Sequence, residues 1–339
     1  MGNIARPAQA RYAGDVTSCV HLQESIVSLE ACLPADLQGP NTKITRIAAG
    51  LSGAGVYRVE AAGNAFVLKI AGEGESVAGW RRKVHIQQLA ADAGLTPRVV
   101  HVDEARRAVV SAFVVDRSFP AFYGDPRTRE AALEQLGRTV RRVHELPLPS
   151  DGDLKDPREF LASIWSRLGA NFALPTFVGD AVRRVLMEEA PTRERAPVLS
   201  HNDVNPTNLA YDGERILLLD WDTAGLNDPF YDLAAISVFL RMDEETCQKL
   251  LAAYDGAPVS TLPARFAYNR RVVAVLCGSL FLHMARHGGH AGATEAETLE
   301  STPSLVEVYQ RMRAGSLKPA TGEGQWWFGL ALVKESLAL

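Results

Sequence analysis

The sequence predicts an α+β protein with two lobes, a small antiparallel β-sheet lobe followed by a larger, mainly helical lobe. Apolar runs separated by turn residues fill residues 43–115, which is typical of strands. From Arg127 onward, apolar residues recur at helical spacing. The 339 residues are enough to bury a large core and favour two lobes over one. We expect an N-terminal arm and helix over residues 1–40, a first lobe over 41–115 and a second lobe over 116–339.

Composition excludes several classes of protein. Apolar content of 47%, charged content of 22% and a net charge of −4 are ordinary for a globular protein, and no basic tract suggests a nucleic-acid partner. The longest apolar run, residues 272–285, is too short to insert in a membrane and predicts a buried helix. The cysteines form no C-x-x-C pair, and the N-terminus lacks an apolar signal segment. We therefore expect a cytoplasmic protein, and its oligomeric state stays open.

The first lobe should begin with three antiparallel strands within residues 43–70. A loop of small residues between the first two, residues 48–55, would let backbone N–H groups of Ser52 and Gly53 approach phosphates. Lys69 lies inside the apolar third strand, where its charge is costly unless a ligand uses it, and a nucleotide phosphate is a natural partner. The alternative is a lysine that reaches solvent from an edge strand.

A helix over residues 75–93 and strands over 98–103 and 108–115 complete the first lobe. Gly94 ends this helix, and Pro97 follows shortly after. Its middle, residues 80–87, contains no acidic residue. Either Glu73 or Glu75 at its start pairs with Lys69, or a nucleotide alone holds the lysine.

Helices are expected through the rest of the chain. The helix expected over residues 129–146 ends near His144, which we interpret as a helix-end histidine rather than a catalytic one. The expected ranges are 18–32 in the N-terminal region, and 129–146, 158–169, 176–190, 232–241, 244–254, 264–286 and 302–313 in the second lobe.

Chemistry-bearing residues concentrate between residues 201 and 222. Asp203 is followed after five residues by Asn208, and the strand-like run 216–219 ends on Asp220-Trp221-Asp222. Between them, residues 211–214 predict a tight Asp-Gly hairpin turn, which would fold Asp220 back beside the loop of Asp203. One carboxylate to orient a hydroxyl, and an amide with a second carboxylate to hold a metal, are what phosphoryl transfer needs. Each aspartate alone could merely cap a turn, but the ordered set favours the functional interpretation.

The motifs support a family resemblance. HNDVNPTN, from His201, resembles the H-x-D-x-x-x-x-N catalytic loop of the aminoglycoside phosphotransferase and choline kinase family, and LLLDWD resembles its metal-binding segment. DPFYDLA, residues 228–234, is similar to the D-x-x-x-D-L-A segment that follows. The resemblance implies a two-lobed protein kinase-like fold that binds ATP and Mg²⁺. It makes Asp203 the catalytic base, Asn208 and Asp220 the metal and nucleotide ligands, and His201 and Asp232 structural supports of the loop.

The acceptor is the least determined feature. Asp222 could assist the metal or recognise a cationic substrate. Residues 324–332, with Trp326 and Trp327, resemble the aromatic C-terminal helix of choline kinases, where rings could hold a quaternary ammonium, although aromatic residues at helical spacing are usually core. The resemblance implies transfer of the γ-phosphoryl group to a hydroxyl of a small cationic amino alcohol, such as choline or ethanolamine. The alternatives are an aminoglycoside or other sugar-like acceptor, and a catalytically silent nucleotide-binding scaffold.

Overall fold

The computed structural model describes residues 29–47, 54–72, 74–148, 154–168 and 172–339. The predicted N-terminal arm, most of the helix over 18–32, Glu73, Ser52 and Gly53 lie outside these residues. The chain divides into two compact units, residues 1–84 with 98–113 and residues 85–97 with 114–339. The predicted lobe boundary at residues 115–116 lies next to the break at residues 113–114.

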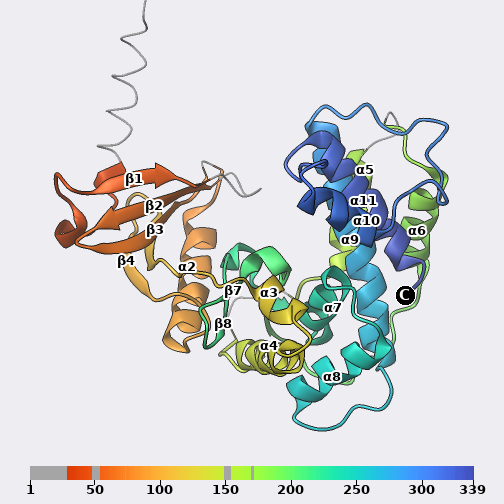
Figure 1. Cartoon of the computed structure of the whole chain (residues 1–339), viewed down its shortest axis with the longest axis horizontal. Helices are drawn as coiled ribbons and strands as arrows, with labels where there is room; N and C mark the ends of the chain where they lie inside the picture. The colour runs from red at the N-terminus through yellow and green to blue at the C-terminus, as the bar shows by residue number, and fades with distance from the viewer. Residues whose placement is uncertain (1–28, 48–53, 73, 149–153, 169–171) are drawn as a thin grey trace, which may run out of the picture. The chain divides into compact units, whose positions relative to one another are not determined.

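The first unit is built on a five-stranded antiparallel sheet of order β1-β2-β3-β5-β4 (Figure 1). All five strands were expected, with small differences at their ends. Their bounds are Lys43–Arg46 (β1), Gly55–Ala61 (β2), Asn64–Ile70 (β3), Val99–Asp103 (β4) and Ala108–Ala112 (β5). The β2–β3 hairpin closes through Ala62 and Gly63, whose φ angles of 49° and 74° are those of a tight mirror-image turn.

Lys69 lies in the central strand of this sheet. It pairs with Val56 on β2 and with Val109 on β5, so β3 has neighbours on both sides. The strand is therefore not the edge strand that the alternative assumed, although Lys69 keeps part of its surface exposed. Residues alternate across a strand, so Lys69 projects from the face opposite to buried Leu68.

Each face of the sheet has its own apolar cover. On one face, Leu68 packs with Val59 and Val110, and Leu33 and Leu37 from the preceding segment close this core. On the other, Val109 packs against Trp80 and Val84 of helix α2 (Val77–Asp92). The strand residues Val59, Val109 and Val110 suit these positions, because β-branched side chains pack well on the pleated surface of a sheet.

The second unit is mainly helical, as predicted. The helices differ from expectation by a few residues at their ends, and α3 was not predicted. They are α3 (Phe119–Gly124), α4 (Arg129–His144), α5 (Pro157–Leu168), α6 (Thr176–Met187), α7 (Phe230–Phe239), α8 (Glu244–Asp255), α9 (Ala264–His287), α10 (Leu305–Arg313) and α11 (Gly322–Ser336). The end of α2 belongs to this unit, where Ile86 and Ala90 join its core.

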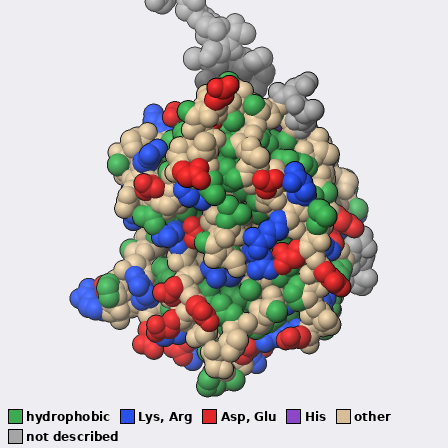
Figure 2. Space-filling model, turned by 90° about the vertical axis from the view of Figure 1, so that its right-hand side faces the viewer, with side chains coloured by type: hydrophobic (Ala, Val, Ile, Leu, Met, Phe, Trp, Pro, Cys, Tyr) green, Lys and Arg blue, Asp and Glu red, His purple; other side chains and the backbone are tan. Residues whose placement is uncertain are grey.

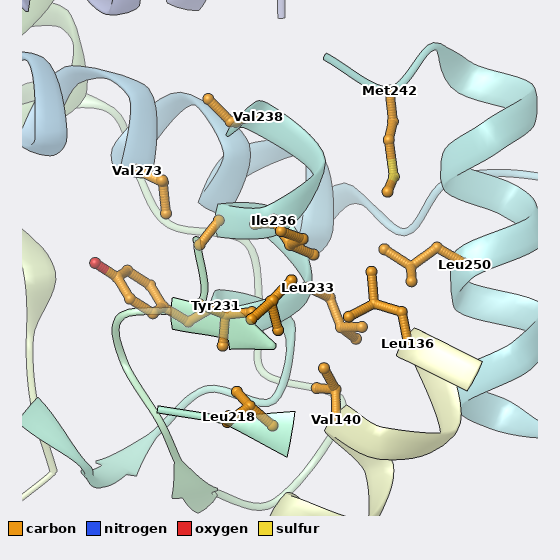
Figure 3. Close-up of a cluster of buried hydrophobic side chains, with 14 of the residues drawn as sticks. Leu136, Val140, Leu218, Tyr231, Leu233, Ile236, Val238, Met242, Leu250 and Val273 are labelled. Atoms are coloured by element: carbon orange, nitrogen blue, oxygen red, sulfur yellow. The ribbon is translucent and has the colours of Figure 1, made fainter. Parts of the chain in front are cut away.

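Helix α9 is the structural centre of the second unit. It packs against α5, α7 and α11, and the predicted buried segment 272–285 lies within it. Gly278 lets α11 approach closely, because a Cβ there would lie 2.6 Å from Cγ2 of Val333 and 2.9 Å from the Gly329 carbonyl oxygen. Two apolar cores flank α9, and Figure 3 shows part of one of them, with side chains from α4, α7, α8 and α9 converging around Leu233.

Four short strands carry the segment that contains the candidate residues. The predicted hairpin is confirmed, since β7 (Leu209–Tyr211) pairs with β8 (Ile216–Leu218), and its loop is residues 212–215 rather than the predicted 211–214. A second pair, β6 (Val198–Ser200) with β9 (Gly225–Asn227), was not predicted. Two short 3-10 turns lie between these strands, η2 (Pro206–Asn208) before β7 and η3 (Trp221–Thr223) between β8 and β9.

The surface mixes charges of both signs. On the face shown in Figure 2, Lys and Arg side chains lie beside Asp and Glu side chains, with apolar side chains between them. In the part of the chain that the structure describes, no helix combines the length and apolarity that crossing a bilayer requires.

Candidate active site

The loop that follows β6 is held from behind by Asp232. This aspartate lies in the first turn of α7 and is fully buried. Its two carboxylate oxygens accept hydrogen bonds from the backbone N–H groups of His201 and Asn202, each at 2.8 Å. Asn202 has a φ of 64°, a left-handed conformation that asparagine tolerates better than most residues. The clamp therefore fixes the loop one residue before Asp203.

The charge of Asp232 is stabilised inside the protein. Burial alone would raise the pKa of this carboxyl, but the hydrogen bond and positive field of His144, and the backbone N–H of His201, lower the pKa below its ordinary value. His144 Nε2 lies 3.1 Å from Asp232 Oδ2, and His144 Nδ1 lies 2.9 Å from the Tyr254 hydroxyl. His144 does end helix α4, as expected, but its long-range role beside Asp232 was not foreseen.

Asn202 connects the loop to the segment after β8. Its side-chain N–H groups donate to the carbonyl oxygens of Thr223 and Gly225, at 3.1 and 3.2 Å, and its Oδ1 accepts from Asn227 at 2.7 Å. Nothing in the local sequence distinguishes this residue from a loop asparagine, and its partners lie more than twenty residues away. Sequence reasoning therefore missed it.

Asp203 is held by two amides. Its Oδ1 accepts from Asn205 at 2.9 Å and its Oδ2 from Asn208 at 2.7 Å. Burial raises the pKa of Asp203 to about 6, against the effect of these two hydrogen bonds, and the negative charges of Asp220 and Asp232 raise it further. Asn205 is a second residue that the sequence did not single out.

The β7–β8 hairpin brings Asn208 and Asp220 to the same end. Leu209 pairs with Leu218, and the next residue on each side continues the contact, because the Leu219 N–H donates to the Asn208 carbonyl oxygen at 2.8 Å. Asp220 follows directly and is exposed. Its φ of 61° and ψ of 77° place it in a left-handed conformation, of the kind that is retained at functional sites because surrounding contacts enforce it.

His201 supports this end of the hairpin. Its Nε2 lies 3.0 Å from the Leu219 carbonyl oxygen, and its ring meets the Trp221 ring edge-on at 4.8 Å. Complete burial lowers the pKa of His201, so the neutral ring can donate to that carbonyl. The structure thus brings Asp203, Asn208 and Asp220 to one edge of the loop, with His201 and Asp232 behind them.

The residues fit a magnesium ion. The Asn208 Nδ2 is engaged with Asp203, which leaves its Oδ1 as the amide atom able to bind a cation beside the exposed Asp220 carboxylate. Within the described ranges, no group of three or more His, Cys, Asp or Glu side chains forms a metal cage. Magnesium in kinases takes one or two protein oxygens, with phosphates and water supplying the rest, so this donor set suits it.

The other predicted residues have different surroundings. Lys69 belongs to the first unit, and Glu75, its suggested partner, lies 2.5 Å from Lys83 in an ion pair. Asp222 lies in η3, two positions beyond Asp220, and is partly buried.

The two tryptophans differ in exposure. Trp326 is fully buried in the core shared by α9 and α11, stacked on His290 at 4.3 Å and edge-on to Phe172 at 5.7 Å. These contacts favour the core interpretation for Trp326, whereas Trp327 keeps part of its surface exposed.

Comparison with known proteins decides the family. The phosphotransferase enzyme family matches residues 43–268, which include both the sheet of the first unit and the hairpin of the second. The chain belongs to the phosphotransferase enzyme family. This confirms the family that the motifs of residues 201–234 suggested, and the protein is a phosphotransferase of the small-molecule kinase type.

The individual proteins that resemble this phosphotransferase have low sequence identity to it or match only part of it. It is 37% identical over 114 residues to the protein LicA of Haemophilus influenzae, a match that spans 32% of this chain and 43% of that protein. A choline/ethanolamine kinase family protein from Mesorhizobium loti has a similar fold, with 22% identity, a TM-score of 0.58 and coverage of 93% of this chain and 99% of the other.

Two further solved structures share the fold. They are choline kinase LicA from Streptococcus pneumoniae (15% identity, TM-score 0.56, 93% of this chain and 99% of that one) and a spectinomycin phosphotransferase bound to ADP and spectinomycin (16%, 0.56, 93% and 98%). At these identities the likeness establishes the kinase-like fold and confirms the predicted fold class.

Proposed function

We propose that this phosphotransferase is an ATP- and Mg²⁺-dependent kinase that transfers the γ-phosphoryl group to a hydroxyl of a small cationic amino alcohol, of the choline or ethanolamine type. The observation that carries the proposal is the state of Asp203, a carboxylate of raised pKa held by Asn205 and Asn208 beside the exposed Asp220.

Asp203 has the properties of a general base. With a pKa of about 6 it is mostly ionised at neutral pH, yet it binds a proton more strongly than an ordinary aspartate. Its two amide donors fix the carboxylate plane, so an acceptor hydroxyl would meet it in one orientation. Asp203 would take the hydroxyl proton as the oxygen attacks the γ-phosphorus in line.

Asn208 and Asp220 would hold the magnesium ion. Bound there, magnesium supplies neutralisation of the negative charge on the β- and γ-phosphates. Within the first unit, Lys69 in the central strand is the residue proposed to contact nucleotide phosphate oxygens. Ser52 and Gly53, proposed for the same role, lie outside the described residues. Complexes with AMP and ADP are known for proteins of similar fold, a LicA and the spectinomycin phosphotransferase, which supports a nucleotide as the donor. With ATP as the proposed donor, we propose the cytoplasm as the place of action.

The acidic surroundings favour a cationic acceptor. Asp203, Asp220 and Asp222 lie within one short stretch, and the fields of Asp220 and Asp222 both act on His201 behind it. A positively charged nitrogen beside the reacting hydroxyl would be attracted to this group of carboxylates. Similarity to the LicA proteins makes choline and ethanolamine the first candidates. Trp327 could add an aromatic face to the site.

A sugar-like acceptor is the second candidate. Aminoglycosides carry both amines and hydroxyls, so the same carboxylates would attract them, and a spectinomycin phosphotransferase shares the fold. The silent scaffold is a third candidate, motivated by the absence of an acidic residue from positions 80–87 in the middle of α2.

Phosphoryl transfer can be measured directly. ADP formation would be followed with ATP and Mg²⁺ in the presence of choline, ethanolamine or spectinomycin, for the wild type and for Asp203→Asn. We expect turnover of choline or ethanolamine that depends on Mg²⁺ and disappears in the variant. Turnover of spectinomycin alone would select the second candidate. Binding of ATP without transfer to any of the three would select the scaffold.

A further inference from the structure

The Tyr231 hydroxyl makes no hydrogen bond with any residue that the structure describes. The residue lies on the first turn of α7, next to Asp232, and only 6% of its surface is exposed. In Figure 3 its ring leaves the apolar cluster around Leu233 and carries the hydroxyl at the far end. Within the described residues this hydroxyl is not one of the fully buried polar atoms that lack a partner, so the oxygen keeps contact with solvent. The hydroxyl is therefore available to a ligand.

Cys277 lies near the same place. It is four residues after Val273 on α9, so both project from one face of that helix. Figure 3 shows Val273 beside Tyr231, and both belong to the core against which Cys277 packs. Cys277 is a free, partly buried cysteine, and its thiol likewise has no hydrogen-bond partner in the described part of the chain.

Asp203 is the third member of this group. Asp232 is clamped to the N–H groups of His201 and Asn202, which places Asp203 just beyond the start of α7, where Tyr231 lies. Electrostatics agrees with this placement. Burial raises the pKa of Tyr231 and that of Cys277, the latter to about 12, and the negative charge of Asp203 adds to both effects. Both groups therefore stay protonated at neutral pH. Both also lie close enough to Asp203 for its charge to affect them.

We propose that Tyr231 and Cys277 form the wall of the acceptor subsite, with the Tyr231 hydroxyl bound to the acceptor's reacting oxygen and Cys277 setting the space beside it. This rests on the proposed function. An alcohol oxygen has one proton and two lone pairs. The proton would go to Asp203, one lone pair would attack phosphorus, and the other would accept from the Tyr231 O–H. Three contacts would then fix the orientation of the nucleophile.

Two substitutions test the subsite, each with a matched control. Tyr231→Phe removes only the hydroxyl, and Tyr268→Phe does the same at a buried tyrosine of the other core. Cys277→Leu fills space, whereas Cys277→Ser keeps the size. Steady-state KM for acceptor and for ATP would be measured separately with choline, ethanolamine and spectinomycin. Circular dichroism would verify folding.

We expect Tyr231→Phe to raise the acceptor KM about 5- to 15-fold, the effect of one lost hydrogen bond, and to leave the KM for ATP unchanged. Cys277→Leu should raise the acceptor KM at least as much. Cys277→Ser keeps the space beside the acceptor, so it should raise the acceptor KM less than Cys277→Leu does, and the Tyr268→Phe control should behave as the wild type. Unchanged acceptor KM in both Tyr231→Phe and Cys277→Leu, or equal changes for acceptor and ATP, would overturn the subsite.

Calorimetric titration separates this inference from the proposed function. The three acceptors would be titrated into the protein with ADP and Mg²⁺ present, which requires no phosphoryl transfer. If one of the three acceptors binds but is not phosphorylated, the proposed function fails. The dissociation constants of that acceptor for the four variants then decide the subsite, because they should change among the variants as the acceptor KM was expected to change. If none of the three binds at millimolar concentration, the subsite is overturned too.

Discussion

The two sides of the loop at residues 201–208 hold carboxylates with opposite properties. Asp232, behind the loop, is fully buried, yet its pKa is lowered. Asp203, in front, is less buried, yet its pKa is raised to about 6. Burial disfavours the charged form of both, so burial cannot explain the difference.

Hydrogen-bond donors explain it. Asp232 accepts from two backbone N–H groups and contacts His144, which favour its charged form. Asp203 accepts from two neutral side-chain amides and experiences the charges of Asp220 and Asp232. The donors around Asp232 thus stabilise its charge, whereas Asp203, the proposed base, has a raised pKa and binds a proton more strongly than an ordinary aspartate.

The largest expected effect concerns catalysis at Asp203. Asp203→Asn should lower kcat about 10²- to 10⁴-fold, the usual contribution of a general base, with little change in nucleotide affinity. The ADP-release assay measures the first and fluorescent-nucleotide titration the second. Asp180→Asn, on the exposed side of α6, is the control and should keep wild-type kcat. Activity retained by Asp203→Asn would remove Asp203 from the role of base.

The opposite carboxylate should matter for folding. Asp232→Ala leaves two backbone N–H groups and His144 without their acceptor inside the protein, so we expect the free energy of unfolding to fall by about 3 kcal/mol. Urea denaturation monitored by tryptophan fluorescence measures it, with Asp180→Ala as the exposed control. A loss below about 0.5 kcal/mol, the usual range for surface changes, would show that Asp232 is not a support of the loop.

The difference between the two carboxylates predicts that substitution of Asp203 stabilises the protein, whereas substitution of Asp232 destabilises it. Asp203→Asn removes a charge that burial disfavours, so we expect the free energy of unfolding to rise by about 1–2 kcal/mol at neutral pH. The measurement should be made without magnesium, since a bound cation would stabilise the wild-type carboxylate. If Asp203→Asn is instead as destabilising as Asp232→Asn, the proposed difference between the two carboxylates is incorrect.

The dependence of stability on pH should distinguish the two positions further. The folded pKa of Asp203, about 6, lies above its ordinary value of 3.8, so its destabilising effect is full above pH 6 and vanishes as pH falls toward 4. The folded pKa of Asp232 lies below 3.8, so its stabilising effect persists down to about pH 4 and is lost only below that.

Denaturation of both Asn variants at pH 7, 5.5 and 4.5 measures this difference. From pH 7 to pH 4.5, the difference between wild type and Asp203→Asn should shrink. The difference between wild type and Asp232→Asn should stay nearly constant. Parallel changes in the two variants would contradict the opposite shifts.

Local chemistry determined much of the fold. The β7–β8 hairpin followed from an Asp-Gly turn between apolar residues, and the amphipathic α4 followed from apolar positions such as Leu133, Leu136 and Val140. The sheet strands followed from apolar runs between turns. In each case the deciding interactions join residues only a few positions apart, so the sequence carries the signal directly. Helix α3 and the β6–β9 pair were missed because each is short and its pairing or packing is not local.

The sequence by itself determined which side chains have the chemistry for phosphoryl transfer and in what order they occur. Only the tertiary structure decided their states: the His144–Asp232 contact, the Asn202 bridge to Thr223 and Gly225, the raised pKa of Asp203, and the position of Tyr231 near Val273 and Cys277. These features join residues twenty or more positions apart. Their strengths depend on burial and on the direction of each donor, which exist only once the helices and strands have packed.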